Sequence, residues 1–180
     1  GDVRAIPGVP VVQGDIRDTE LVRQAVRDFA VDAVVHFGAY KAAGESMEDP
    51  HRYFDNNVAA TIALLGVLDE CEVTNFVFSS SCAVYGTPKV LPVDESHPFG
   101  PESPYGESKF LVERMLSWYD QCRPLRSVSL RYFNASGASH DARIGEDWAS
   151  SLNLVPIVMK AALGRRPPVK VCGSDSEPPG

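Results

Sequence analysis

The sequence predicts an α/β protein built on a doubly wound parallel sheet. Three observations carry this prediction. Short apolar runs alternate with longer helical patterns, most of the runs are apolar at every position, and polar or glycine-bearing segments follow the strands. Strands that are apolar on both faces are typical of a parallel sheet that helices cover on both sides.

The composition fits one globular domain, with at most an added lobe. The chain has 180 residues, of which 44% are hydrophobic and 23% are charged, so it can bury a core. Its formal net charge of −7 argues against a broad basic face for nucleic acid or anionic membranes. The longest apolar run, at 58–68, is too short to span a membrane.

The amino-terminal half predicts strands and helices in alternation. A short buried strand is expected at residues 9–12. A helix follows over about 20–29, because Asp18 can cap it and its apolar residues form one stripe. A second strand is expected at 33–37 and a long helix at about 50–71.

The carboxyl-terminal half continues the alternation. One helix should begin at Pro104, since Ser103 suits the N-cap and proline suits the first helical position. The other expected elements are a strand at 76–78, a polar loop at 86–103, a strand at 128–130, a helix at 152–163 and a short strand at 169–171.

Ligands of such sheets lie beyond the carboxyl ends of the strands. The segments that follow the expected strands are therefore where chemistry is expected, and all of them are polar, glycine-bearing or both. They are residues 14–17, 38–41, 79–81 and 134–138.

Tyr105 and Lys109 form the first candidate catalytic pair. They stand four positions apart at the start of an expected helix, so both project from one face. A phenol has a pKa of about 10, but a cation one turn away and a bound oxidised nicotinamide would both favour its ionised form. The phenol could then act as a base toward a sugar hydroxyl. The alternative is a surface tyrosine stacked on a lysine stem.

A run of three serines, residues 79–81, ends the third expected strand. A hydroxyl at that point could bond both the Tyr105 phenol and a substrate oxygen. A serine run by itself is more typical of a turn or a helix cap, so the functional interpretation depends on the surrounding sequence.

The cysteines and histidines predict neither a metal site nor a disulfide. No C-x-x-C pattern occurs and no two histidines are close. Reduced thiols in a soluble cytoplasmic protein are the simpler interpretation. The residues concerned are Cys71, Cys82, Cys122, Cys172, His36, His51, His97 and His140.

Several strings in one order resemble the extended short-chain dehydrogenase/reductase superfamily and, within it, the UDP-glucose 4-epimerases. The resemblance extends from residue 14 to about residue 173. Its main strings are GDIR at 14–17, HFGAYKAAGES at 36–46, DNNV at 55–58, FVFSSSCAVYG at 76–86, SPYGESK at 103–109 and RYFNASGA at 131–138.

The resemblance implies an NAD-binding protein with a named set of site residues. The implied catalytic residues are Ser81, Tyr105 and Lys109. The implied cofactor contacts are Asp15, Ile16, Phe37, Gly38, Ala39, Tyr40, Lys41, Asn56, Ser81, Tyr105, Lys109 and Phe133. The implied UDP-sugar contacts are Ser81, Tyr105, Asn134, Asn153 and Leu154.

The same resemblance implies a Rossmann-like sheet, incomplete here, over residues 1–135 and the start of a UDP-sugar-binding lobe over 136–180. The implied reaction is the interconversion of UDP-glucose and UDP-galactose by reversible oxidation at C4 of the sugar. It also implies a cytoplasmic homodimer whose subunits meet through the helices at 50–71 and 104–122.

Two alternatives to this reaction stay open. One is a 4-epimerase of another UDP-sugar, either UDP-N-acetylglucosamine or UDP-arabinose. The other is a non-catalytic short chain that dimerises with a full-length relative. Dehydration is disfavoured, because related dehydratases carry an acid pair where this chain has Cys82 and Ala83.

The sequence also departs from the pattern of the superfamily. No G-x-G-x-x-G turn precedes Gly14, and the chain stops soon after residue 173. We therefore expect a piece of a longer protein, which by itself folds poorly and has little or no epimerase activity.

Overall fold

The computed structural model describes residues 8–141, 143–148, 151 and 153–170. The chain divides into two compact units. One consists of residues 12–133, and the other combines residues 1–11 with 134–180. The candidate catalytic residues all belong to the larger unit.

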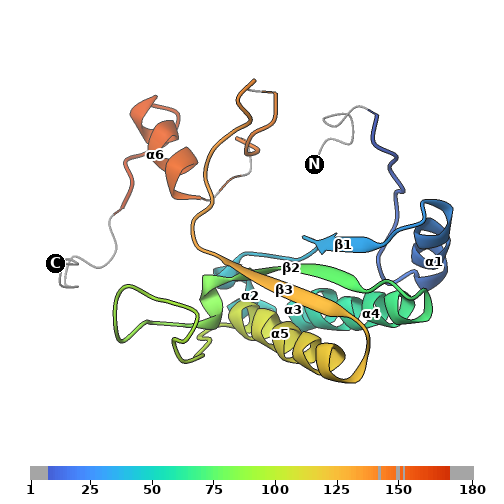
Figure 1. Ribbon diagram of the computed structural model, residues 1–180. Coiled ribbons are helices and arrows are strands. Elements are labelled where there is room, and N and C mark those ends of the chain that lie inside the picture. The colour runs from blue at the N-terminus through green and yellow to red at the C-terminus, as the bar shows by residue number, and fades with distance from the viewer. Residues whose placement is uncertain (1–7, 142, 149–150, 152, 171–180) are drawn as a thin grey trace. The chain divides into compact units, whose positions relative to one another are not determined.

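The larger unit is organised around a parallel sheet with the strand order β1-β2-β3 (Figure 1). The strands are β1 (Ala33–His36), β2 (Asn75–Ser81) and β3 (Arg126–Tyr132). In the register, Ser80 of β2 lies beside Arg131 of β3, and Ser81 lies beside Tyr132. The predicted parallel sheet is confirmed. The serines of β2 belong to the strand rather than follow it, because their backbones continue the ladder with β3.

The helices of the larger unit begin close to where the sequence predicts. Helix α1 (Thr19–Asp28) is capped by Asp18, whose side chain accepts a hydrogen bond from the backbone of Leu21 at 3.1 Å. Helix α5 (Pro104–Cys122) is capped by Ser103. Both caps were predicted, because a cap depends only on residues within one turn.

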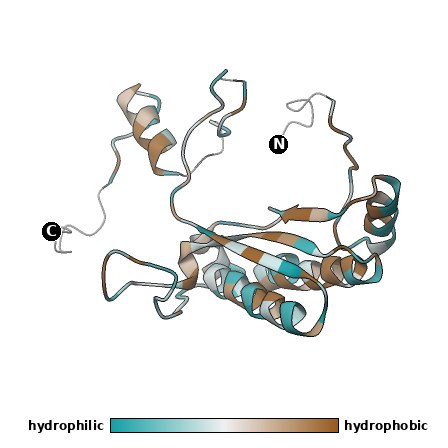
Figure 2. Cartoon of the chain, viewed as in Figure 1, coloured by the Kyte–Doolittle hydropathy of each residue, from teal (hydrophilic) through white to brown (hydrophobic). Residues whose placement is uncertain are grey.

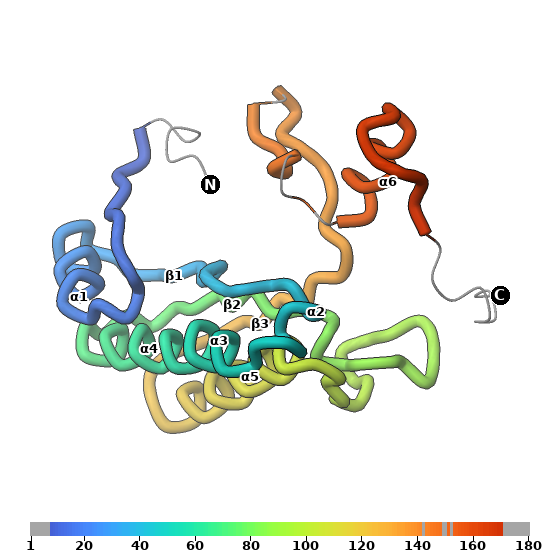
Figure 3. The backbone as a smooth tube through the Cα atoms, turned by 180° about the vertical axis from the view of Figure 1, so that it is seen from behind, coloured from blue at the N-terminus to red at the C-terminus, as the bar shows by residue number. Residues whose placement is uncertain are grey.

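The long helix expected at 50–71 is present but changes its winding. It consists of α3 (Pro50–Phe54), a π-helical turn at Asp55–Ala59 and α4 (Ala60–Glu70). Figure 3 shows these parts running on as one helix beside α5. The short helix α2 (Ala43–Glu48) precedes it and was not predicted. A 3-10 turn, Cys82–Val84, follows β2.

The core lies between one face of the sheet and helices α1, α4 and α5. Phe76 and Phe78 of β2 are each 1% exposed, and burying a side chain of this size contributes about 1.5–3 kcal/mol. Figure 2 shows the apolar residues concentrated in the strands and along the helices beneath them. The helical residues of the core are Val26, Leu64, Leu65, Leu68, Val112 and Leu116.

The opposite face of the sheet differs from the expectation that helices cover both sides. Val35, Val128 and Leu130 are 55%, 57% and 38% exposed. Their side chains alternate with the buried ones, so they point away from α4 and α5. The described helices of the larger unit pack against one face only.

Residues 9–12 do not form the predicted strand. A strand needs a neighbour for its backbone hydrogen bonds, and the described strands pair only with one another. Val9 and Val11 are each 55% exposed. Residues 169–170 also form no strand, and residue 171 of that predicted strand lies outside the described residues.

The described part of the smaller unit contains helix α6 (Leu154–Ala162) and one antiparallel bridge between Ala138 and Gly145. The helix predicted at 152–163 is thus confirmed over residues 154–162, while residue 152 lies outside the described residues. Every helix that the structure describes, in either unit, is too short or too polar to cross a membrane.

Candidate active site

The first turn of α5 is packed tightly against the 3-10 turn that follows β2. The Ser103 hydroxyl accepts a hydrogen bond from the Gly106 amide at 3.1 Å. Gly106 is buried, and a Cβ at that position would lie 2.6 Å from the carbonyl oxygen of Ala83. This close approach places Tyr105 next to the end of β2.

The backbone of Tyr105 is held by α2. Its amide donates to the Ser46 hydroxyl at 3.1 Å, and Ser46 in turn donates to the carbonyl of Ala43 at 2.6 Å. The ring meets that of Tyr53 edge-on, with 6.4 Å between centroids. Ser46 belongs to one of the quoted strings, but nothing in the sequence predicted this contact.

The Tyr105 phenol lies close to Ser81. Burial raises the pKa of Tyr105, while a hydrogen bond with the Ser81 side chain acts to lower it. Ser81 is itself 9% exposed, and its hydroxyl also accepts a hydrogen bond from the Ala83 amide at 3.2 Å. The pair can therefore pass a proton to or from a group placed between the two hydroxyls.

Lys109 lies one turn after Tyr105 on the same face of α5. It is 4% exposed, and its ammonium group donates to the carbonyl of Ser79 at 2.8 Å. The Nζ atom lies 6.0 Å from the centroid of the Tyr105 ring. Burial lowers the pKa of Lys109 to about 8. An ammonium group has three donors, so this geometry leaves donors for ligand hydroxyls.

His36, at the end of β1, is a buried neighbour of this cation. Its Nε2 lies 3.1 Å from the Thr61 hydroxyl, and the residue is 5% exposed. Burial, and secondarily the charge of Lys109, lowers the pKa of His36 to about 4. The imidazole is thus neutral near pH 7 and adds no second charge beside Lys109.

The segment after β1, residues 37–41, is clamped by Asn57 from the π-helical turn. The Asn57 side chain accepts from the Tyr40 amide at 2.9 Å and donates to the Tyr40 carbonyl at 3.1 Å. It also donates to the Ser108 hydroxyl of α5 at 3.1 Å. Sequence reasoning passed over Asn57, although it stands next to Asn56 in the DNNV string.

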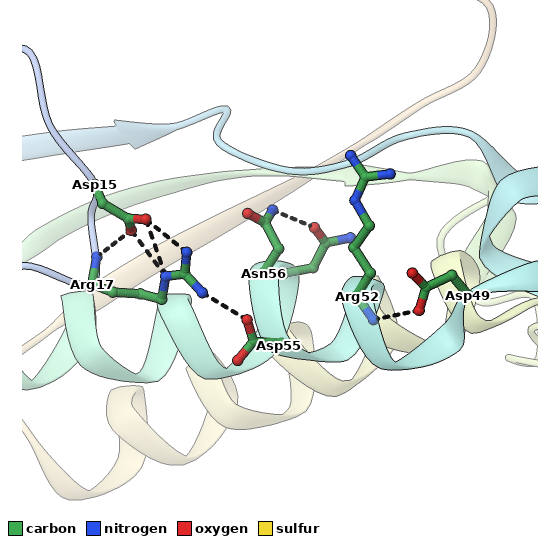
Figure 4. A network of polar contacts seen from close by, with 7 residues as sticks. Asp15, Arg17, Asp49, Arg52, Asp55 and Asn56 are labelled. Atoms are coloured by element: carbon green, nitrogen blue, oxygen red, sulfur yellow. Dashed lines mark hydrogen bonds and ion pairs between the residues drawn. The ribbon is translucent and has the colours of Figure 1, made fainter.

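The Asp15 carboxylate is hydrogen-bonded to Arg17 of the same chain (Figure 4). It accepts from the backbone amide of Arg17 at 2.8 Å and from its guanidinium at 2.7 Å. These hydrogen bonds lower the pKa of Asp15 to about 2. Arg17 also pairs with Asp55 at 2.7 Å, so it ties the segment after residue 14 to the π-helical turn. Asn56 belongs to that turn, and its amide donates to the side-chain oxygen of Asn57 at 3.0 Å.

The structure thus brings together part of the predicted site. Ser81, Tyr105 and Lys109 meet at the carboxyl end of β2. Asp15, Ile16, Phe37, Gly38, Ala39, Tyr40, Lys41 and Asn56 belong to the same unit. Phe133 ends this unit and is 59% exposed. Asn134, Asn153 and Leu154 belong to the smaller unit, and their role stays a prediction.

The donors present suit a dinucleotide rather than a metal ion. A buried ammonium, two hydroxyls and the Asn56 amide offer hydrogen bonds to ribose and carboxamide groups. Among the residues that the structure describes, no group of three or more histidines, cysteines or carboxylates could hold a metal ion.

Comparison with known proteins agrees with this geometry. A family model described as GDP-mannose 4,6 dehydratase matches residues 3–177. The UDP-glucose 4-epimerase of Lactobacillus helveticus is 43% identical over 169 residues, which cover 94% of this chain and 51% of that protein.

Solved structures give the same result. The UDP-glucose 4-epimerase of Brucella ovis, in complex with NAD, has a TM-score of 0.89 and 43% identity, covering 93% of this chain and 52% of that one. The enzyme of Bifidobacterium longum, in complex with NAD+ and UDP, has a TM-score of 0.85 and 41% identity, covering 96% and 53%. These matches confirm the resemblance and the Rossmann-like fold. The chain spans about half the length of the relatives it matches.

Proposed function

The chain belongs to the protein family described as GDP-mannose 4,6 dehydratase, and on this premise we propose that the whole protein interconverts UDP-glucose and UDP-galactose with NAD as its cofactor. The observation that carries the proposal is the meeting of Ser81, Tyr105 and Lys109 at the carboxyl end of β2. The relatives support it, since those described above are all UDP-glucose 4-epimerases.

In this proposal each side chain of the trio has one task. Tyr105 takes the proton from the 4-hydroxyl of the sugar and later returns it. Ser81 bonds the same oxygen and stabilises the ionised phenol. Lys109 holds ribose hydroxyls with the donors that Ser79 does not use. Bound NAD supplies the hydride acceptor and donor for C4. The reaction leaves the cofactor unchanged, so it can stay bound.

The remaining cofactor and substrate contacts follow the resemblance. Asp15, Ile16, Phe37, Gly38, Ala39, Tyr40, Lys41, Asn56 and Phe133 would complete the cofactor site. We assign residues 1–135 to the cofactor domain and 136–180 to the UDP-sugar lobe. Asn153 and Leu154 of that lobe, together with Asn134 just before it, would hold the UDP-sugar. The UDP group would anchor the substrate while the sugar turns over.

Epimerisation fits this chain better than dehydration. Expelling water from the ring needs a carboxylic acid beside the reacting carbon. The two residues after Ser81 are Cys82 and Ala83, which form the 3-10 turn and carry no carboxyl group. The described residues therefore offer a phenol and a hydroxyl for proton transfer at C4, and the two positions after Ser81 carry no acid for elimination.

A single substitution tests the function. In the whole protein, Tyr105→Phe should lower the rate of UDP-galactose formation from UDP-glucose by about 100-fold or more, because it removes the proton-transferring oxygen. NAD should remain bound, as its absorbance after protein denaturation would show.

Tyr119→Phe is the matched control, since Tyr119 lies on the same helix and packs against the core. It should leave turnover unchanged. A Tyr105→Phe enzyme that keeps most of its turnover would contradict the proposal.

We further propose a cytoplasmic homodimer that uses the helices at 50–71 and 104–122. Both helices carry a large exposed apolar side chain, Ile62 at 51% and Trp118 at 62% exposure. Among the described residues, Cys71, Cys82 and Cys122 are free thiols, which suits a reducing compartment.

A further inference from the structure

Four polar side chains meet on the helix-covered face of the sheet, one residue away from Ser81. The Ser80 hydroxyl donates to Oε1 of Glu113 at 2.5 Å. The Arg131 guanidinium donates to Oε1 through Nε at 3.0 Å and to Oε2 through Nη2 at 2.7 Å. Its Nη1 donates to the Tyr85 hydroxyl at 2.7 Å. We call these residues the carboxylate network: Ser80, Tyr85, Glu113 and Arg131.

The carboxylate network is largely removed from water. The side chains of Glu113 and Arg131 are 8% and 19% exposed, and the guanidinium carbon lies 4.7 Å from the centroid of the Phe99 ring. Burying two charges costs solvation free energy that their attraction roughly offsets, so such a pair adds little net stability over apolar residues. Its two-point geometry, by contrast, fixes the orientation of both partners.

Two members of the network adjoin residues of the candidate site, and a third pairs with one of them. Ser80 lies between Ser79, which accepts the bond from Lys109, and Ser81. Glu113 stands one turn after Lys109 on α5, and Arg131 is the register partner of Ser80 on β3. The network therefore joins β2, β3 and α5 at the level where the catalytic side chains leave them.

We propose that Glu113 and Arg131 are positioning residues, which hold α5 in register with β2 and thereby set the distances among Ser81, Tyr105 and Lys109. The expected effect on turnover rests on the proposed function. A shift of about 1 Å in a reacting group can lower a rate about 100-fold, so a loosened register has a large effect.

The first test is Glu113→Gln in the whole protein. Glutamine keeps the shape of the side chain but leaves the Arg131 charge unpaired. The turnover number per bound NAD should fall about tenfold or more, while KM for UDP-glucose changes less than about twofold. Asp120→Asn is the control, because Asp120 pairs with Arg126 across the same α5 and β3 but its side chain is 45% exposed. It should change neither quantity.

A second variant separates positioning from stability. Glu113→Met combined with Arg131→Met replaces the ion pair with apolar side chains of similar length. Its thermal unfolding midpoint should be closer to the wild-type value than that of Glu113→Gln, while its turnover number should stay low. Recovery of both would overturn the proposal, and so would a Glu113→Gln enzyme with wild-type turnover.

An optical titration tests the positioning role without substrate, so its result does not depend on the reaction. The absorbance difference between the wild type and Tyr105→Phe follows the ionisation of Tyr105, whose titratable or charged neighbours are Cys82, Lys109 and Tyr53. Glu113→Gln should raise its pKa further, because the hydrogen bond with Ser81 is lost.

The outcomes distinguish the two proposals. If the wild type does not convert UDP-glucose but Glu113→Gln still shifts this titration, the proposed function fails and the positioning role holds. If the enzyme is active and neither turnover nor titration changes, the positioning role fails alone.

Discussion

Gly106 shows how single residues shape the candidate site. A Cβ at Gly106 would lie 2.6 Å from the backbone oxygen of Ala83 and 3.2 Å from Pro101. We expect Gly106→Ala to push the first turn of α5 away from β2 and to lower both turnover and the free energy of unfolding, the latter by about 1–3 kcal/mol. Urea unfolding and a UDP-glucose assay measure these effects.

Gly66→Ala is the matched control for this prediction. Gly66 also lies in a helix, but a Cβ there would meet nothing within 4 Å. Alanine is the better helix former. This variant should therefore keep its activity, and its free energy of unfolding should rise by up to about 1 kcal/mol. Equal losses in both variants would refute the close-packing explanation.

His36 predicts a pH dependence of stability. Its pKa is lowered to about 4 in the folded protein, against about 6.5 in an unfolded chain. The unfolded state therefore binds more protons between these values, and stability is lost as the pH falls from about 6.5 to about 4. From pH 7 to pH 5 the loss from this residue is up to about 2 kcal/mol.

His36→Gln removes the titration while keeping a nitrogen that can reach Thr61. The unfolding free energy of this variant should fall less between pH 7 and pH 5 than that of the wild type. His51→Gln, at an exposed position, should behave like the wild type. If the unfolding free energy of His36→Gln depends on pH as that of the wild type does, the His36 imidazole is not the source of this dependence.

At the scale of elements, the π-helical turn joins three segments. Asn57 bonds both the amide and the carbonyl of Tyr40 and reaches Ser108 on α5. Residue 57 is 3% exposed, so losing its side chain leaves buried polar groups without partners. Turns of this kind often occur at functional sites.

Asn57→Ala should therefore loosen the segment at 37–41. We expect the Kd for NAD to rise about tenfold or more and the free energy of unfolding to fall by about 2 kcal/mol. Fluorescence titration with NAD measures the first effect. Asn75→Ala removes an exposed amide that bonds Asp32 and should change neither; a similar loss of affinity there would argue against a specific role for Asn57.

At the scale of the whole molecule, the proposed dimer is testable through α5. Trp118→Glu places a charge on an exposed apolar position of the helix, and burying that charge in an interface would be costly. Sedimentation of the whole protein should show a shift from dimer to monomer. Val90→Glu, in the exposed loop at 86–103, should leave the dimer intact, and a Trp118→Glu protein that stays dimeric would place the interface elsewhere.

The sequence by itself determined what depends on near neighbours along the chain. The caps at Asp18 and Ser103, the apolar strands and the placement of Tyr105 and Lys109 on one helix face all follow from residues a few positions apart. Local propensities and side-chain periodicity act over that range, so these features could be predicted.

Only the tertiary structure decided which distant groups meet. The pairing of Glu113 with Arg131 spans 18 residues, and that of Asn57 with Ser108 spans 51. Residues 9–12 are apolar enough for a strand, yet they form none because no described strand pairs with them. Such outcomes depend on hydrogen-bond partners that the fold brings together, and spacing along the chain carries no record of those partners.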